Sequence, residues 1–312
     1  MSRVGAIDCG TNSIRLLIAE TSGVRLRDLH REMRIVRLGQ GVDATGRFAP
    51  EALARTRAAL SDYADLLHRY EVEHIRMVAT SAARDVSNRE AFFEMTSDLL
   101  GAVIPGSVAE VISGEQEAAL SFNGAVADLN SDAGPFVVVD LGGGSTEVVL
   151  GDTGMVAAHS ADIGCVRLTE RFLHSDPPSA GEVSAARKLV REKLDEALRV
   201  VPVESAATWV GLAGTFTTLA ALAKRMTAYD ADTIHLSTVS FDDLLPVCAE
   251  LIGMTRAYRA ALGPMHEGRV DVIGGGAIVV EELARALGSR AGIDSLVVSE
   301  HDILDGIALS LA

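Results

Sequence analysis

Short apolar runs alternate along the chain with longer segments in which apolar side chains recur every three or four positions. The runs Val4–Asp8, His74–Ala79 and Phe136–Asp140 have the length and composition of buried strands. The segment that begins at Pro50 is predicted to be a helix, because mostly apolar side chains recur on one of its faces. These side chains are Leu53, Thr56, Leu60, Tyr63, Leu67 and Tyr70. Such alternation of strands and helices predicts the α/β class.

The rest of the chain continues this alternation. Further strands are predicted at Ser13–Ala19, Val24–Leu38, Val108–Ile112, Ser145–Leu150, Met155–Ser160, Thr208–Leu212 and Gly292–Ser299. Further helices are predicted at about 88–100, 166–173, 179–200 and 302–311. Another helix begins at Ser113, which forms a Ser-x-x-Gln capping box with Gln116. A turn is predicted at Gly214–Thr215, and the polar segment Asn130–Pro135 indicates a domain boundary.

An internal repeat is the most informative feature of the sequence. Ala6–Ser13 aligns with Val138–Ser145 at a constant offset of 132 residues. In both copies an apolar strand ends in an aspartate, Asp8 or Asp140, and a turn of glycine and small residues follows before a second apolar strand. Because the copies match in sequence and in the place of the aspartate, we interpret them as two related parts of a ligand site.

The composition of these turns points to phosphate binding. Glycines allow several backbone N–H groups to converge on one point, and a hydroxyl adds a further donor. An aspartate at the strand end can hold a divalent cation that bridges phosphate oxygens. Neither turn is a Walker loop, since GxxxxGK[ST] is absent, nor a Rossmann loop, since a strand follows the glycines. We expect two facing copies to hold a phosphorylated ligand in an interdomain cleft.

The charge and the cysteine content limit the binding partners and the cellular compartment that we expect for this protein. Lys and Arg number 28 against 43 Asp and Glu, a formal net charge of −15, which argues against general nucleic-acid binding. The three cysteines, Cys9, Cys165 and Cys248, have no metal-ligand spacing and fit reduced, buried thiols in a cytoplasmic protein. Asp8 and Arg15 interrupt any signal-peptide pattern, and no segment has the character of a membrane span, so we expect no membrane association.

Several motifs, taken together, resemble the exopolyphosphatase/guanosine pentaphosphate phosphohydrolase (Ppx/GppA) family of the actin/hexokinase/Hsp70 ATPase superfamily. The two most specific are Ser-Gly-x-x-Glu-Ala at 113–118 and Asp-x-Gly-Gly-Gly-Ser-Thr-Glu at 140–147. Other matching segments are 6–13, 37–41, 78–84, 164–167, 211–215, 269–271 and 274–276. The length of 312 residues fits the short, two-domain form of the family.

The resemblance implies two ribonuclease-H-like (actin-like ATPase) lobes with an interdomain cleft. We expect residues 1–123 and 300–312 in the first lobe and residues 124–299 in the second. The implied activity is that of an exopolyphosphatase, which releases terminal orthophosphate from inorganic polyphosphate by metal-assisted hydrolysis. Three alternatives stay open: a guanosine pentaphosphate phosphohydrolase, a weakly catalytic alarmone or polyphosphate sensor, and an actin-like kinase or ATPase. We expect a homodimer.

The resemblance also implies roles for particular residues. Glu117 is the expected catalytic base or water-positioning group, whereas Glu115 is expected to be a carboxylate at the helix start. Glu147 is expected to orient water and to hold metal, with Asp140 as the main Mg²⁺ ligand and Asp8 as its counterpart in the other lobe. Mn²⁺ is the alternative cation.

Phosphate contacts are expected from both hairpins, from nearby arginines and from the later glycine turn. The expected phosphate-binding residues are Gly10, Thr11, Asn12, Ser13, Arg15, Arg84, Gly142, Gly143, Gly144, Ser145, Gly214 and Thr215. Arg15 and Arg84 are expected to form a basic strip along the cleft, and Arg167 and Arg269 are weaker candidates for this strip. Leu304 stands where an arginine is common in the family, and this departure predicts a preference for short polyphosphate chains.

Overall fold

The computed structural model describes residues 2–22 and 25–312. Val24, at which the third strand is predicted to begin, lies outside these residues. The chain divides into two compact units, residues 1–124 with 303–312, and residues 125–302. The expected lobe boundaries lie within three residues of these junctions. Among the described residues, no helix is both long enough and apolar enough to cross a membrane.

The first unit is built on a five-stranded sheet with the order β3-β2-β1-β4-β5. Its strands are β1 (Ser2–Cys9), β2 (Ser13–Ser22), β3 (Arg25–Ile35), β4 (His74–Ala79) and β5 (Glu110–Val111). β1 pairs antiparallel with β2 and parallel with β4, and β4 pairs parallel with β5. The helices are α1 (Val42–Thr45), α2 (Pro50–Arg69), α3 (Ser81–Arg84), α4 (Glu90–Gly101), α5 (Gly114–Val126) and α13 (Ile303–Leu309).

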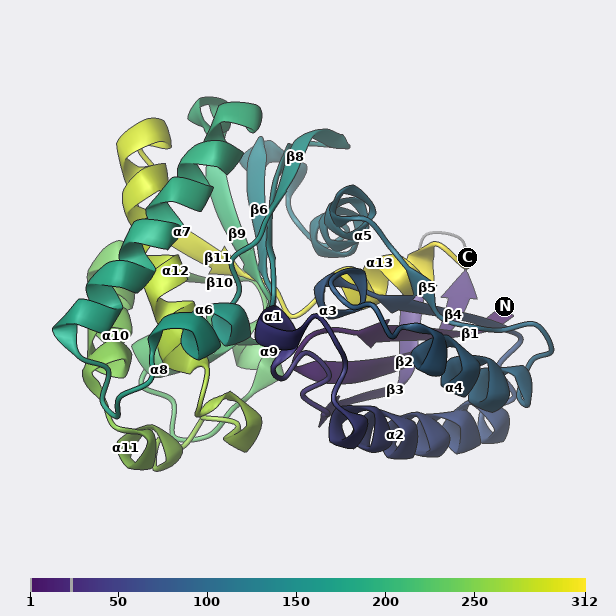
Figure 1. Cartoon of the computed structure of the whole chain (residues 1–312). Coiled ribbons are helices and arrows are strands. Elements are labelled where there is room, and N and C mark those ends of the chain that lie inside the picture. The colour runs from purple at the N-terminus through teal and green to yellow at the C-terminus, as the bar shows by residue number, and fades with distance from the viewer. Residues whose placement is uncertain (1, 23–24) are drawn as a thin grey trace. The chain divides into compact units, whose positions relative to one another are not determined.

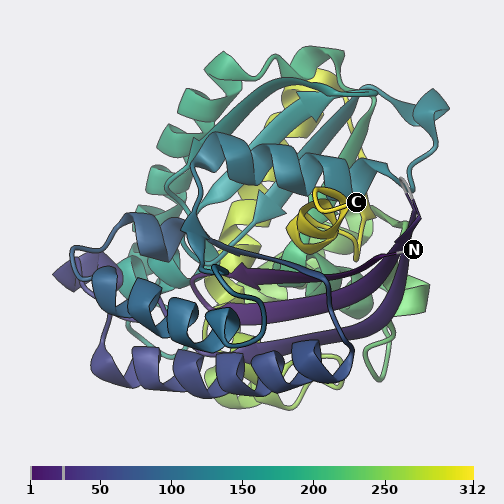
Figure 2. The same ribbon diagram turned by 90° about the vertical axis from the view of Figure 1, so that its right-hand side faces the viewer.

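Side chains alternate along the central strands, so this sheet has two buried faces. Ile7 points to the face where Leu60 of α2 and other apolar side chains pack. Ala6 points to the opposite face, where Leu120 of α5 and Ile303 of α13 complete a second cluster. Figure 1 and Figure 2 show α2 and α4 side by side on one face of the sheet and α13 on the other.

The second unit contains a six-stranded sheet with the order β10-β11-β9-β6-β7-β8. Its strands are β6 (Phe136–Leu141), β7 (Thr146–Gly151), β8 (Met155–Ala161), β9 (Thr208–Leu212), β10 (Ser237–Ser240) and β11 (Ser295–Val298). Its longer helices are α6 (Cys165–Phe172), α7 (Ala180–Val200), α8 (Ala213–Ala223), α10 (Phe241–Gly253) and α12 (Ile273–Ala291). Short helices are α9 (Ala231–Ile234), α11 (Arg256–Ala260), η1 (Ser131–Ala133), η2 (Val203–Ser205) and η3 (Glu267–Arg269).

A large apolar core lies between this sheet and its long helices. Val139 and Trp209 contribute from the sheet, Val190 from α7, Phe216 from α8 and Ile278 from α12. Figure 1 shows these helices gathered on one face of the second sheet. This core supports β6 and β9, whose carboxyl ends lead into the second glycine turn and into α8.

The two sheets repeat one topology. The order β3-β2-β1-β4-β5 of the first unit corresponds to β8-β7-β6-β9-β11 of the second, in which β10 adds a further edge strand. In both, the two hairpin-connected strands run antiparallel to each other, whereas the next strands run parallel to the central strand. The predicted α/β class with two ribonuclease-H-like lobes is confirmed.

Two local predictions were wrong. Gly214 and Thr215 are not in a separate turn but in the first turn of α8, which begins at Ala213 directly after β9. Ala213 has a φ of 70°, so one residue makes the change of direction that the prediction assigned to the glycine. The strand predicted at Val108–Ile112 shortens to β5, and Val108 is exposed.

Candidate functional site

The glycine turn of the first unit is a closed hairpin at the end of β1. The N–H of Gly10 donates to the carbonyl of Ser13 at 2.9 Å. The carbonyl of Asn12 accepts hydrogen bonds from the N–H groups of Val36 and Arg37, at 3.1 and 2.8 Å. The segment after β3 therefore anchors the turn through the Asn12 carbonyl. This contact uses a carbonyl oxygen of the turn, whereas a phosphate would be bound by N–H groups of the turn.

Asp8 and Arg15 face each other across this hairpin. They are partners in the β1–β2 register, and the Arg15 guanidinium donates to Oδ2 of Asp8 from Nε at 3.0 Å and from Nη2 at 2.7 Å. Asp8 is only 5% exposed. The structure thus joins an expected metal ligand and an expected phosphate ligand in one ion pair. Because the guanidinium already compensates its charge, Asp8 fits a structural role better than a metal-binding role.

Arg84 and Glu117 form another ion pair in the first unit. Nη1 of Arg84, at the end of α3, donates to Oε2 of Glu117 at 2.7 Å and to the carbonyl of Ile112 at 3.1 Å. Glu117 is 7% exposed, whereas Glu115 is exposed. The expected capping box is present, since Ser113 and Gln116 exchange hydrogen bonds. The helix start therefore turns Glu117 inward and holds its carboxylate against Arg84.

Sheet topology explains why these residues from distant parts of the sequence lie at one edge. β1, β4 and β5 are parallel neighbours, so their carboxyl ends point the same way. The glycine hairpin follows β1, α3 follows β4, and α5 follows β5. Ligand sites of open α/β sheets commonly lie at this edge. The first unit thus presents its hairpin, Arg84 and Glu117 at the edge where binding is expected.

The glycine turn of the second unit has the same backbone closure. The N–H of Gly142 donates to the carbonyl of Ser145 at 3.0 Å. The first turn of α6 anchors this turn, because the N–H groups of Cys165 and Val166 donate to the carbonyls of Gly142 and Gly143, at 3.0 and 2.9 Å. A Cβ on Gly164 would lie 2.3 Å from the carbonyl oxygen of Gly143, so only glycine permits this approach.

Asp140, Glu147 and Ser160 form a row across three adjacent strands of the second unit. Asp140 is the register partner of Glu147, and Glu147 is the register partner of Ser160. Partners in register point to the same face of a sheet. Glu147 is 1% exposed, and its Oε1 accepts a hydrogen bond from Oγ of Ser160 at 2.7 Å. The row therefore places two buried carboxylates and one hydroxyl together beside the glycine turn.

The chemistry of this donor set fits a hard divalent cation. Mg²⁺ and Mn²⁺ prefer carboxylate oxygens as protein ligands. Two carboxylates on neighbouring strands repel each other in a low-dielectric environment, and a bound cation would compensate both charges. Asp140 and Glu147 are thus better suited to hold a metal than Asp8, which is paired with Arg15.

Gly214 and Thr215 begin α8 at the carboxyl end of β9, which is the parallel neighbour of β6. A Cβ on Gly214 would lie 2.2 Å from Nε of Arg269, so the glycine admits this guanidinium against the helix. Nη1 of Arg269 also donates to Oγ1 of Thr218 at 3.1 Å. Burial raises the pKa of the nearby Cys165 thiol to about 11, although the charge of Arg269 opposes this. Cys165 is therefore a protonated, unreactive thiol.

The four arginines expected in a basic strip each interact with a group of their own unit. Arg15 contacts Asp8 and Arg84 contacts Glu117. Nη1 of Arg167 lies 3.9 Å from a carboxylate oxygen of Asp162, and Arg269 contacts Thr218. The structure brings Arg15 and Arg84 to the hairpin edge of the first unit, and Arg269 to α8 of the second.

Leu304 is a core residue of the first unit. This residue lies on α13, is 1% exposed, and belongs to the apolar cluster that contains Val4, Ala6 and Leu120. A side chain at this position points into the core of the first unit and not toward a ligand. This burial does not test chain length, so the preference for short chains stays a prediction.

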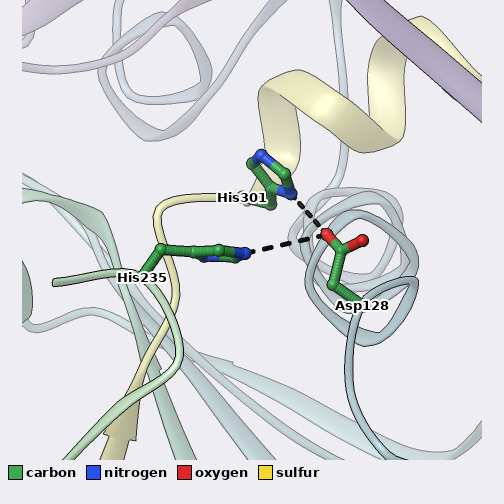
Figure 3. A group of neighbouring side chains, drawn as sticks. All are labelled: Asp128, His235 and His301. Atoms are coloured by element: carbon green, nitrogen blue, oxygen red, sulfur yellow. Dashed lines mark hydrogen bonds and ion pairs between the residues drawn. The ribbon is translucent and has the colours of Figure 1, made fainter. Parts of the chain in front are cut away.

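A cluster of Asp128, His235 and His301 lies elsewhere in the second unit (Figure 3). Oδ2 of Asp128 lies 2.5 Å from Nδ1 of His301 and 3.9 Å from Nε2 of His235. Nδ1 of His235 accepts a hydrogen bond from the N–H of Glu300 at 3.2 Å, so the proton of the neutral ring is on Nε2. Nε2 then offers no lone pair to a metal, and the cluster is better explained as a hydrogen-bonded contact.

Comparison with known proteins assigns the chain to a family. The model of the Ppx/GppA phosphatase family matches residues 17–311. The chain belongs to this family. It is 72% identical to Exopolyphosphatase 2 of Mycobacterium tuberculosis over 316 aligned positions, which cover 100% of this chain and 99% of the relative. It is 33% identical to a guanosine-5'-triphosphate,3'-diphosphate pyrophosphatase of Vibrio vulnificus, over 73% of this chain and 44% of that protein.

Solved structures of Ppx/GppA proteins share the fold. An exopolyphosphatase-like protein matches with a TM-score of 0.94 and 42% identity, over 99% of this chain and 98% of the other. The Aquifex aeolicus family member matches with a TM-score of 0.81 and 31% identity, over 99% and 97% of the two chains. The two ribonuclease-H-like units are therefore those of the actin-like ATPase fold.

Sequence reasoning missed two features of this Ppx/GppA protein. The prediction placed Ser160 in a strand but did not extend to the register that sets this residue opposite Glu147. Counting back from the β7–β8 turn would not have found it, because the register shifts between Leu150 and Gly151 and a regular count pairs Glu147 with His159. Asp128, His235 and His301 are separated by long stretches of sequence, and no spacing rule connects them.

Proposed function

We propose that this member of the Ppx/GppA family is an exopolyphosphatase, which releases terminal orthophosphate from inorganic polyphosphate. The observation that carries this proposal is the 72% identity, over the full length of both chains, to Exopolyphosphatase 2. The guanosine-5'-triphosphate,3'-diphosphate pyrophosphatases are more distant, and this chain spans less than half of the Vibrio vulnificus relative. Guanosine pentaphosphate is therefore the substrate with less support.

Asp140 and Glu147 are the residues that we propose hold Mg²⁺, with Mn²⁺ as its substitute. Their carboxylates are buried on neighbouring strands, next to the turn that ends at Ser145. A bound divalent cation would compensate negative charge on the transferred phosphoryl group. The backbone N–H groups and hydroxyls of the two glycine hairpins would bind the phosphate oxygens. The first N–H groups of α6 support the second hairpin, because they donate to the carbonyls of Gly142 and Gly143.

Glu117 is the proposed general base, which takes a proton from the attacking water. Its burial and its contact with Arg84 fix the position of the carboxylate. Arg84 has donors suited to phosphate as well as to carboxylate, so it is a proposed phosphate ligand too. Arg15 has a weaker claim to that role, because its guanidinium donates twice to Oδ2 of Asp8.

Phosphate release from polyphosphates of graded length tests this proposal, with guanosine pentaphosphate and ATP measured in parallel. We expect polyphosphate to be the best substrate, EDTA to abolish the activity, and Mg²⁺ or Mn²⁺ to restore it. Faster release from guanosine pentaphosphate would replace the proposed substrate. Release from ATP alone would favour the kinase-like alternative, and tight binding without turnover would favour the sensor.

A homodimer and a cytoplasmic location remain further proposals. Cys9, Cys165 and Cys248 are buried and free, as is usual in a reducing compartment. Light scattering during gel filtration measures the oligomeric state directly, and a mass of one chain would refute the dimer.

A further inference from the structure

Ser160 stands out among the side chains around the proposed metal ligands, because its hydroxyl reaches one of them directly. It lies on β8, at the edge of the second sheet, and its Oγ donates to Oε1 of Glu147 at 2.7 Å. Glu147 lies on β7 between Asp140 on one side and Ser160 on the other. The three strands thus set a hydroxyl, a carboxylate and a second carboxylate side by side in one row.

A buried glutamate needs such a partner in order to act as a well-placed ligand. Its side chain has three rotatable bonds, and fixing them in one orientation costs conformational entropy. A hydroxyl that donates to one carboxylate oxygen selects the orientation of the carboxylate. Groups that hydrogen-bond a metal ligand in this way commonly tune the affinity for the metal.

The first unit provides an internal comparison. Its equivalent row consists of Asp8, Arg15 and Met33, since Arg15 is the register partner of both other residues. The thioether of Met33 has no proton to donate, and Arg15 is held by Asp8 instead. Where the second residue of the row is a carboxylate, Glu147, the third residue is a hydroxyl, Ser160. This row lies in the unit that we propose binds the metal.

We propose that Ser160 is a positioning residue, whose hydroxyl fixes the Glu147 carboxylate in the orientation required to hold a divalent cation together with Asp140. This inference rests on the metal-binding part of the proposed function. It does not depend on which phosphoanhydride is the substrate.

The test compares Ser160→Ala with Ser160→Thr, which keeps a hydroxyl on a β-branched side chain suited to a strand. His159→Ala is the matched control, because His159 is the neighbouring residue on β8 and points to the opposite face. Mn²⁺ affinity is measured by electron paramagnetic resonance of the free ion, without substrate. Thermal stability, kcat and KM are recorded for the same proteins.

We expect Ser160→Ala to weaken Mn²⁺ binding by about 10–100-fold, Ser160→Thr to restore most of the affinity, and His159→Ala to leave it unchanged. The melting temperatures of Ser160→Ala and Ser160→Thr should be similar. The inference is overturned if Ser160→Ala binds Mn²⁺ within about twofold of the wild type, or if Glu147→Gln leaves Mn²⁺ binding unchanged. Failure to release phosphate from polyphosphate, with the Mn²⁺ effects intact, would refute the proposed substrate alone.

Discussion

The two glycine hairpins have the same backbone but opposite side-chain chemistry. Gly10 closes on Ser13 and Gly142 closes on Ser145 through equivalent hydrogen bonds. The residue after the first hairpin, opposite Asp8, is an arginine, whereas the residue opposite Asp140 is Glu147. One row neutralises its aspartate within the protein, and the other presents two carboxylates together. The repeat therefore sets the positions, and the opposite charge at the second position is the reason why we propose the cation site in the second unit.

This contrast also indicates a division of labour. The first unit supplies a buried ion pair at its hairpin and a second pair, Arg84 with Glu117, at the neighbouring strand ends. The second unit supplies the carboxylates of Asp140 and Glu147 with a hydroxyl beside them. Changes in the first unit should therefore affect proton transfer or stability, and changes in the second should affect metal affinity.

The largest effect is expected from Glu117→Gln. The amide keeps the size of the side chain but cannot accept a proton, so turnover should fall by roughly 10²–10⁴-fold. Mn²⁺ affinity should not change, because Glu117 is proposed to act on the attacking water and not to hold the cation. Steady-state phosphate release measures the first quantity, and Glu115→Gln is the control, since Glu115 is exposed. Turnover within about threefold of the wild type would remove Glu117 from the mechanism.

Glu147→Gln and Asp8→Asn test directly whether the two hairpins differ in metal binding. Loss of the Glu147 charge should lower turnover by roughly 10²–10³-fold and weaken Mn²⁺ binding. Asp8→Asn should leave Mn²⁺ affinity nearly unchanged but destabilise the first unit by about 3 kcal/mol, because the partly buried Arg15 loses its partner. Calorimetry and Mn²⁺ titration separate the two outcomes. Equal weakening of Mn²⁺ binding by both variants would show that the hairpins share the metal.

Leu304→Arg tests whether phosphate contacts extend to α13. The guanidinium would enter the apolar cluster around Val4 and Leu120 without a designed partner, so we expect a loss of about 3–5 kcal/mol of unfolding free energy. Leu304→Met preserves volume and should cost less than about 1.5 kcal/mol. A stable Leu304→Arg protein with raised affinity for long polyphosphate would instead support a phosphate-binding role for this position.

The smallest effect is expected at the cluster in Figure 3. Asp128 follows the start of the second unit and His301 precedes its end, so their contact joins the two ends of this unit. Asp128→Asn should reduce stability by about 0.2–1 kcal/mol, because the groups are partly exposed. Zn²⁺ should bind equally weakly to the wild type and to this variant. Zn²⁺ affinity that depends on Asp128 would contradict the hydrogen-bonded assignment.

The candidate site residues could be named from the sequence because they lie in short, local motifs. Asp140 and Glu147 are joined by one tight hairpin, so their pairing follows from the turn alone. Glu117 could be distinguished from Glu115 by its position in the family motif, and in the structure Glu117 is buried whereas Glu115 is exposed. The pairing of Arg84 with Glu117 could not be predicted, because it depends on two parallel strands whose contact no local pattern encodes.

The sequence by itself determined the α/β class, the repeat and the family resemblance, and it named the candidate carboxylates, since each depends on periodicity or on residues close together in the chain. Only the tertiary structure decided what those groups contact. It paired Asp8 with Arg15, placed Ser160 against Glu147, and turned Leu304 into the core. The physical reason is that strand register and helix packing bring distant residues within hydrogen-bond distance, and charge compensation or burial at that distance determines the role of each side chain.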